Sequence, residues 1–378
     1  MTLHRQGEAL RNRSTPKVSV IVPAFNACRT IRETLGSALG QTYGNLEVIV
    51  IDDGSTDNTS KIIQEVASGD GRVRVIQQLN AGVAAARNTG ILQSAGDFIA
   101  PLDADDLWHP SCIEKRMAVL LTGDDNMCGV YAGSRLINKD GYVISSQPIF
   151  TFEGHIFSHL LCLNIIGNGS SLLMRKEAVL AVGGYESWLR TAGAEGCEDS
   201  LLQFRLASKY RFGCVPEYLV GYMKRPDSMS SDIFQMFDSM QRVFEQAEMI
   251  APSLLKPLAR LRGAETQFVK GYHMLKRGRA LKAIELIIRA HIIDARCGIT
   301  GGTFIAERRI QSSRAKKGRR TKSGNISLRQ FRDYDPKEDV HSWIGYLPRR
   351  RLAWIATNDR HIGSLQSPDQ ERVVCQSD

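Results

Sequence analysis

Acidic side chains gather in two short segments of the sequence, each directly after an apolar run. They are Asp52 and Asp53 after LEVIVI (46–51), and Asp103, Asp105 and Asp106 after FIAPL (98–102). Carboxylates held close together repel one another unless a cation or a ligand offsets their charge. Two carboxylate ligands, completed by phosphate oxygens and water, suit Mg²⁺ or Mn²⁺. We therefore predict that Asp103 and Asp105 hold one of these cations against a phosphorylated ligand.

The direction of these two side chains depends on the backbone that joins them. If the chain stays extended past residue 102, side chains at positions i and i+2 point to the same side. A D-x-D pattern is weak by itself, because acidic residues are common in turns. Turn or capping roles account for one or two of the five carboxylates, but not for all of them. The second acidic pair strengthens the cation interpretation.

Short β-branched runs alternate with helical patterns in the first third of the chain. Strands are predicted at 18–22, 46–51, 73–76 and 98–102, and helices at 29–41, after the turn at 52–58, at 82–94 and at 110–121, with Pro110 in the first turn of the last one. This alternation predicts a doubly wound α/β sheet. Ligands of such sheets bind outside the carboxyl ends of the strands, which is where the acidic segments fall.

The remainder of the chain is less regular. Strands are predicted near 129–137 and 142–150, a Gly-rich stretch at 167–171, and a helix after Glu198. From about residue 228 only helical patterns occur, and 258–293 reads as a helical hairpin turning at 276–278. Its predicted facing residues are Ala264, Phe268, Tyr272 and Leu275 on one helix and Ala283, Ile284, Ile287 and Ile288 on the other.

Composition and missing motifs exclude several classes of protein. The sequence has no GxGxxG after the first strand and no GxxxxGK[ST], which argues against dinucleotide-binding and P-loop proteins. Its eight cysteines form no CxxC pair, which argues against a zinc ribbon. The polar N-terminus and the lack of a long apolar run predict a cytoplasmic protein that is soluble or peripheral on a membrane.

Positive charge is concentrated near the C-terminus. The net charge is +9, and most of the excess lies at 307–351. A basic tail suits nucleic acid or the anionic inner face of the cell membrane, and its plain alternative is a solvated, partly disordered segment.

Five segments together resemble the family 2 glycosyltransferases of GT-A fold. They are VSVIVPAFNA (18–27), VIVIDDGSTDNT (48–59), NAGVAAARNTGI (80–91), GDFIAPLDADDLWHP (96–110) and CEDSLLQFRLA (197–207). The resemblance implies a mixed, Rossmann-like sheet. It divides the chain into a polar leader (1–16), a GT-A catalytic domain (17–225), a helical extension (226–300) and a basic tail (301–378).

The resemblance also implies roles for residues that bind a nucleotide-sugar donor. Asp53 would accept a hydrogen bond from the nucleobase, typically uracil, and Pro23 and Phe25 would line the base and ribose. Arg87 would approach the nucleotide. Asp103 would lie near the ribose and the cation, and Asp105 would be the direct metal ligand. The alternatives are a turn role for Asp53, strand-end packing for Pro23 and Phe25, and a solvated helix position for Arg87.

Glu198 and Asp199 match the acidic pair in which the family's aspartate is the catalytic base. An inverting transfer needs one carboxylate to take the proton of the acceptor hydroxyl. The alternative for Asp199 is an N-cap of a helix at 200–209. Segments 167–171 and 183–187 are expected to shape the acceptor side. The QxxRW motif of processive synthases is absent, which favours addition of single sugars.

The resulting hypothesis is an inverting, metal-dependent glycosyltransferase. It would move a sugar from a nucleotide-sugar, expected to be UDP-linked, to a hydroxyl of a saccharide or lipid-linked acceptor in bacterial surface polysaccharide synthesis. No nucleic acid partner is expected. The alternatives are a sugar nucleotidyltransferase and a non-catalytic module that binds a nucleotide-sugar or nucleic acid.

Overall fold

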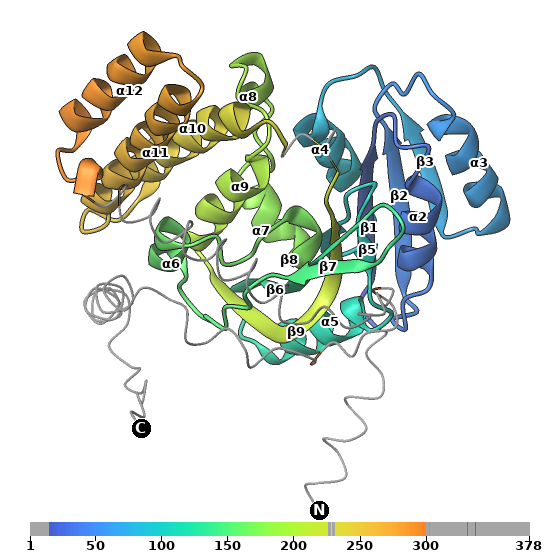
Figure 1. Ribbon diagram of the computed structural model, residues 1–378. Helices are drawn as coiled ribbons and strands as arrows, with labels where there is room; N and C mark the ends of the chain where they lie inside the picture. Colours follow the sequence, from blue (N-terminus) through green and yellow to red (C-terminus); the bar gives the residue numbers. More distant parts are fainter. Residues whose placement is uncertain are drawn as a thin grey trace, which may run out of the picture.

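A mixed sheet of nine strands forms the centre of the protein (Figure 1). The computed structural model describes residues 15–225, 228, 231–299, 302, 331 and 337. The strands are β1 Val18–Ala24, β2 Leu46–Asp52, β3 Val73–Gln77, β4 Phe98–Pro101, β5 Leu107–Trp108, β6 Met127–Ile137, β7 Val143–Ser146, β8 Leu172–Arg175 and β9 Arg211–Met223. Their order is β3-β2-β1-β4-β8-β6-β9-β5, with β7 added to β6. The α/β fold predicted from the sequence is confirmed.

The first half of the sheet is parallel and covered on both faces. Its helices are α2 Ile31–Leu39, α3 Thr59–Gly69 and α4 Val83–Gln93, while α5 Cys112–Thr122 packs on β6, β8 and β9 of the second half. Alternate strand residues point to opposite faces. Ile21 and Ile49 therefore belong to the cluster that contains α4, whereas Val20 and Val48 pack with α2, α3 and α5. Helix α5 begins at Cys112, so the prediction that Pro110 lies in its first turn is wrong.

The second half of the sheet contains three strands that the sequence did not predict, β5, β8 and β9. Strand β8 runs antiparallel to both β4 and β6, and β9 runs parallel to β6. Helices α6 Phe157–Cys162, α7 Lys176–Ala181, α8 Trp188–Thr191 and α9 Glu198–Ala207, with the short 3-10 helix η1 Gly169–Ser171, complete this half. Because β4 meets β8 and η1 precedes β8, the turn after β4 lies beside η1.

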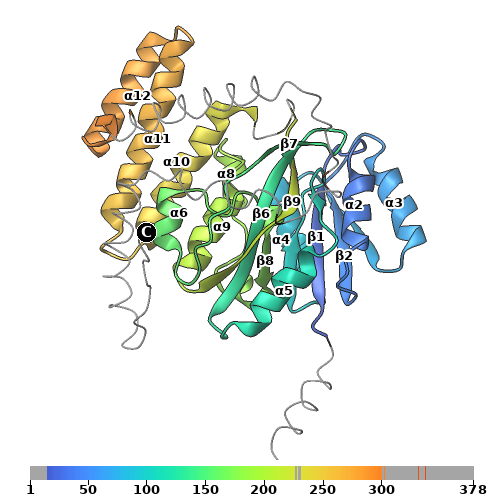
Figure 2. The same cartoon turned by 60° about the horizontal axis from the view of Figure 1, so that its bottom comes forward.

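The helical extension packs beside α6 and α9 (Figures 1 and 2). It consists of α10 Ile233–Ile250, α11 Lys256–Lys276 and α12 Ala280–Ile293, so the predicted helices are present. The predicted hairpin faces are only partly right. Ala264 and Ala283 are buried, but Leu275, Ile284 and Ile288 are more than half exposed.

The reason is that small residues make the contact between α11 and α12. A Cβ added at Gly271 would lie 2.9 Å from Ile287. The inward face of α12 is formed by Ala283, Leu286 and Ala290, and its other apolar residues therefore point outward.

Among the residues that the structure describes, no helix is long and apolar enough to span a membrane. Most of the predicted polar leader, and all of the basic tail apart from residues 302, 331 and 337, lie outside the described residues.

Candidate active site

The acidic segment after β4 forms a tight turn. The backbone N–H of Asp106 donates to the carbonyl of Asp103 over 3.0 Å, so residues 103–106 are not extended as predicted. The turn separates Asp106 from the other two carboxylates. Asp106 is fully buried, and its carboxyl oxygens accept from Ser170 Oγ at 2.6 Å and from the N–H of Met223 at 2.9 Å. Burial, together with Asp105 and Asp103, raises the pKa of Asp106 well above its usual value.

Asp103 and Asp105 remain partly open to solvent. Their side chains are 27% and 22% exposed. Asp103 accepts from Arg87 at 2.5 Å, and Asp105 lies 3.4 Å from the guanidinium of Arg225. The turn thus presents two carboxylates that side-chain cations partly neutralise, and a ligand can still reach both of them.

The acidic pair after β2 behaves differently. Asp52 accepts from the N–H of Ser55 at 3.0 Å and from Ser60 Oγ. Asp53 accepts from the N–H groups of Ala81 and Gly82, at 2.9 and 2.8 Å, and is 3% exposed. Backbone and hydroxyl donors thus satisfy three of the five carboxylates, those of Asp52, Asp53 and Asp106, whereas the sequence predicted such roles for one or two.

Asp53 connects two loops at the edge of the sheet. Besides Ala81 and Gly82, its carboxylate accepts from Gln78 Nε2 at 2.7 Å, and its carbonyl accepts from Asn80 Nδ2 at 2.9 Å. All of these donors belong to the segment between β3 and α4. Asp53 therefore fixes the loop that leads into α4, the helix of Arg87, and its bonds reach beyond its own turn.

Arg87 connects Asp103, in the turn after β4, to Asp199, the expected catalytic base. Its guanidinium donates to Asp103 and, over 2.7 Å, to Asp199, and its side chain is only 3% exposed. Its charge lies 5.0 Å from the centre of the Tyr185 ring. Burial alone would lower the pKa of Arg87, but Asp199 and Asp103 raise it well above the usual value. The alternative of a solvated helix arginine is wrong.

Asp199 lies inside the first turn of α9, whose N-cap is Cys197. The capping alternative for Asp199 therefore does not hold. Its carboxylate lies between Arg87 and Gly169, where an added Cβ would come within 2.9 Å of both carboxylate oxygens. Burial, opposed by Arg87 and assisted by Asp103 and Glu198, raises the pKa of Asp199 to about 6. A carboxylate with this pKa is suited to proton transfer near neutral pH.

Glu198, the other member of the pair, turns away from this network. It is 3% exposed, and its Oε1 accepts from the N–H of Gly196 at 2.7 Å. This contact fixes the loop before α9. Glu198 therefore positions Asp199 and has no direct contact with Arg87 in the hydrogen-bond network.

Pro23 and Phe25 stand at the carboxyl end of β1. Pro23 is buried and pairs with Ile51, whereas Phe25 is 50% exposed. The ring of Phe25 is therefore available to a planar ligand near the end of β2, where Asp53 lies. Pro23 is part of the buried strand β1 that leads to this ring.

The structure adds three residues that the sequence did not single out. Ser170 donates to Asp106 and accepts from the N–H of Asp103 at 3.1 Å. Tyr185 and Arg225 face Arg87 and Asp105. The segments 167–171 and 183–187 gave a signal for Ser170 and Tyr185, whereas no motif pointed to Arg225.

The described residues contain no group of three or more His, Cys, Asp or Glu side chains placed to hold a metal ion. A cation at Asp103 and Asp105 would therefore take its other ligands from the bound molecule and water. Two carboxylates with phosphate oxygens form a donor set suited to Mg²⁺ or Mn²⁺.

Residues 19–179 match the family model described as glycosyl transferase family 2. These residues form a domain that is similar to the family 2 glycosyltransferases. It is 36% identical over 158 residues to a chondroitin synthase of Escherichia coli, which covers 41% of this chain and 23% of that protein. It is 31% identical to the uncharacterized glycosyltransferase RT0329 of Rickettsia typhi, over 48% of this chain and 57% of the relative. The chain thus spans only part of the length of these relatives.

Two solved structures with bound nucleotide-sugars share this fold. Staphylococcus aureus TarS 1-349, in complex with UDP-GlcNAc, superposes with a TM-score of 0.54 at 18% identity, covering 74% of this chain and 83% of that one. The mannosyltransferase PcManGT of Pyrobaculum calidifontis, in complex with GDP-Man and Mn²⁺, gives 0.51 at 18% identity, over 80% and 86% of the two chains. At this identity the likeness establishes the GT-A fold alone.

Proposed function

We propose that the protein transfers a sugar, with inversion, from a nucleotide-sugar to an acceptor hydroxyl. The observation that carries this proposal is the buried bridge Asp103–Arg87–Asp199. It joins a partly exposed carboxylate at the strand end to a carboxylate whose pKa is near 6. A donor-binding group and a base are thus held side by side.

The chemical step needs one proton acceptor. Asp199 takes the proton of the acceptor hydroxyl while the hydroxyl oxygen bonds to the anomeric carbon. The bond from that carbon to the diphosphate breaks on the opposite face, and the nucleoside diphosphate leaves with the bonding electrons. Attack opposite the leaving group inverts the anomeric configuration. Arg87 keeps Asp199 oriented and adjacent to the donor.

Asp53, Pro23 and Phe25 form the nucleobase side of the donor site in this proposal. The relatives with bound ligands carry UDP-GlcNAc and GDP-Man, and a uracil base suits the carboxylate of Asp53 because it offers an N–H donor. Asp105, assisted by Asp103, would hold Mg²⁺ or Mn²⁺ with the diphosphate oxygens. The cation would neutralise the charge that develops on the leaving diphosphate.

The acceptor in this proposal is a saccharide or lipid-linked hydroxyl compound in bacterial surface polysaccharide synthesis. The support is the similarity to a bacterial chondroitin synthase and the helical extension beside the base. A position on the cytoplasmic face of the membrane would bring the enzyme to such an acceptor.

Release of free nucleoside diphosphate tests the function. Purified protein with Mn²⁺ is incubated with UDP-GlcNAc, UDP-glucose, UDP-galactose or GDP-mannose, with and without a membrane lipid extract. We expect release above background from one UDP-sugar, and the extract should increase it. Absence of release from every donor, in protein that binds UDP, would contradict the proposed activity.

A further inference from the structure

A cavity of about 870 Å³ lies between the catalytic domain and the helical extension. This volume is in the range of small-molecule sites. Apolar side chains from four helices line much of it, among them Leu160 of α6, Phe204 of α9, Met236, Met240 and Phe244 of α10, and Val269 of α11. The cavity is separate from the expected nucleotide contacts at Asp53 and Phe25, which do not line it.

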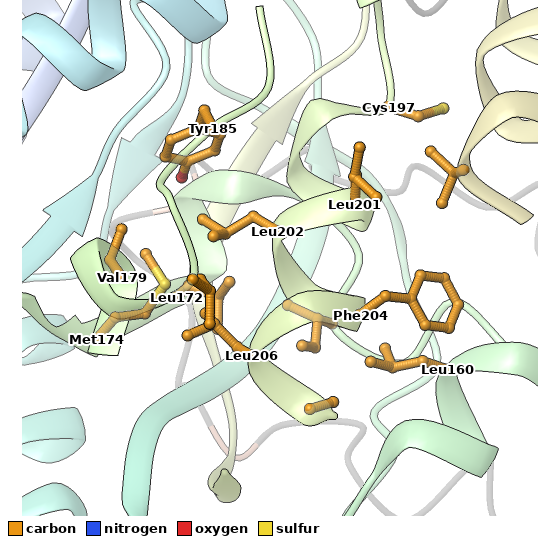
Figure 3. Packing of buried hydrophobic residues seen from close by; sticks show 14 of the residues in the cluster. Leu160, Leu172, Met174, Val179, Tyr185, Cys197, Leu201, Leu202, Phe204 and Leu206 are labelled. Atoms are coloured by element: carbon orange, nitrogen blue, oxygen red, sulfur yellow. The ribbon is translucent and has the colours of Figure 1, made fainter. Parts of the chain in front are cut away.

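Helix α9 connects this cavity to the expected base. In Figure 3, Leu202 and Leu206 point from α9 toward Met174 and Val179, whereas Phe204 and Cys197 point to the other side. Cys197 and Ser200 line the cavity, and Asp199 stands between them in the sequence. The first turn of α9 therefore places Asp199 against Arg87 on one side and lines the cavity with Cys197 and Ser200 on the adjacent side.

A second connection runs through Arg225. Its guanidinium contributes to the lining and lies 3.4 Å from Asp105, the expected metal ligand. The lining also includes Asn164, which bonds to the N–H of Gly167 at 3.0 Å in the loop leading to Gly169. Gly169 itself touches Asp199. The cavity thus adjoins the candidate active site both near Asp199, the expected base, and near Asp105, the expected metal ligand.

The lining suits an amphiphile. Phe204 and Phe244 contact edge to face at 6.2 Å, and the two methionines add flexible, polarisable surface that fits irregular chains. The lining also contains the exposed Lys224 and the partly exposed Arg225, which pairs with Asp105. The charged pair inside the lining, Arg262 with Glu265, is already matched. Apolar walls, together with the cationic Lys224 and Arg225 in the same lining, favour a hydrocarbon chain that carries an anionic headgroup.

The outer face of α12 provides independent support for a lipid. Leu281, Ile284, Ile288 and Ile292 form one helical stripe and are 87%, 53%, 54% and 78% exposed. Basic Lys282 and Arg289 lie beside this stripe on the same helix. Exposed apolar stripes flanked by basic residues are typical of helices that lie on a membrane surface.

We propose that this cavity binds the hydrocarbon chain of a lipid-linked acceptor. Its anionic headgroup would lie near Lys224 and Arg225, and its sugar hydroxyl near Asp199. This inference rests on the proposed function, because it names the acceptor class for that same site. It makes α10 and α11 the part of the chain that selects the acceptor.

Binding of dodecyl phosphate, below its micelle concentration, tests the cavity directly by calorimetry on the full chain. We expect one site per protein, with butyl phosphate at least about tenfold weaker. Thr266→Trp should fill the cavity and weaken dodecyl phosphate binding at least about tenfold, because Thr266 lines it on α11. Thr122→Trp is the matched control. That threonine also donates to a carbonyl of its own helix, but it is exposed at the end of α5.

A dodecyl phosphate with a diazirine at the end of its chain covers the case in which Thr266→Trp does not fold. Photolabelled peptides should come from α10 and α11, and unlabelled dodecyl phosphate should suppress the labelling. Equal affinity for the two chain lengths, unchanged binding in folded Thr266→Trp, or labelling confined to α12 would each overturn the proposal. Donor hydrolysis is measured separately, so failure of the cavity and failure of the proposed activity give different results.

Discussion

The acidic segments after β2 and β4 look alike in the sequence, yet they differ in what neutralises them. After β2, backbone N–H groups and hydroxyls take up the carboxylates of Asp52 and Asp53. After β4, the guanidinium groups of Arg87 and Arg225 face Asp103 and Asp105, which stay partly exposed. Donors on the backbone make a carboxylate part of the scaffold, whereas a side-chain cation can move when a ligand arrives. We therefore expect the segment after β4 to be the reactive one.

The largest effect should come from the reactive segment. Asp105→Ala should lower transfer on the order of a thousandfold, because it removes a cation ligand that contributes several kcal/mol to stabilising the leaving group. EDTA should have the same effect on the unaltered protein. Asp103→Ala should mainly weaken donor binding. Initial rates of UDP release, with and without chelator, provide the measurement, and full activity in EDTA would rule out the metal-dependent mechanism.

The next effect concerns the base. Asp199→Asn keeps the shape of the side chain but cannot accept a proton, so turnover should fall by roughly two to four orders of magnitude while UDP affinity stays near normal. In the unaltered protein the active form of Asp199 is deprotonated, and its pKa is about 6. The rate should therefore fall about tenfold between pH 7 and pH 5. A rate that is level over this interval would remove Asp199 from the base role.

A smaller effect is expected at Asp53, whose carboxylate is bound by backbone N–H groups. Asp53→Ala leaves the N–H groups of Ala81 and Gly82 without their acceptor, which should lower the free energy of unfolding by about 1–3 kcal/mol. It should also weaken UDP binding about tenfold. Urea denaturation and calorimetry measure the two effects, with Asp140→Ala, at an exposed turn, as the control. Unchanged unfolding would show that Asp53 does not fix the loop, and equal binding of UDP and ADP by the unaltered protein would remove its nucleobase role.

The smallest effect should appear at Asp106, next to the proposed metal ligand. Its raised pKa favours the neutral form, and Asp106→Asn can still accept from Met223 and donate to Ser170. We expect a change in unfolding free energy below about 1 kcal/mol and UDP release within about twofold of the unaltered rate. The neighbouring Asp105→Asn should inactivate the protein. If both variants were equally inactive, the distinction between the two kinds of carboxylate would fail.

Periodicity and strand-end position predicted the parallel half of the sheet, because those signals are local. Strand β9 was missed because Pro216 interrupts it. The register against β6 shifts between Ala132 and Gly133, which pair with Val215 and Tyr218, so Pro216 and Glu217 form a bulge. The turn at 103–106 was missed because its geometry depends on Ser170 and Met223, which are distant in the sequence.

The same limit applied to the site. Asp199 and Arg87 could be named from their motifs, but their contact spans 112 positions and arises only when α4 and α9 share one face of the sheet. The sequence predicts that Ile284 and Ile288 face α11, although they are exposed, because both faces of α12 are apolar. Only the small residues of the interface decide which face turns inward.

Because Arg87 touches Asp103 and Asp199 at once, nucleotide binding and protonation are not independent events. A phosphate oxygen that engages Arg87 withdraws positive charge from Asp199 and so increases the affinity of Asp199 for a proton. Thermodynamic linkage makes this reciprocal, so donor affinity must change with pH by the same factor. The enzyme that holds its donor is therefore a stronger base than the empty enzyme.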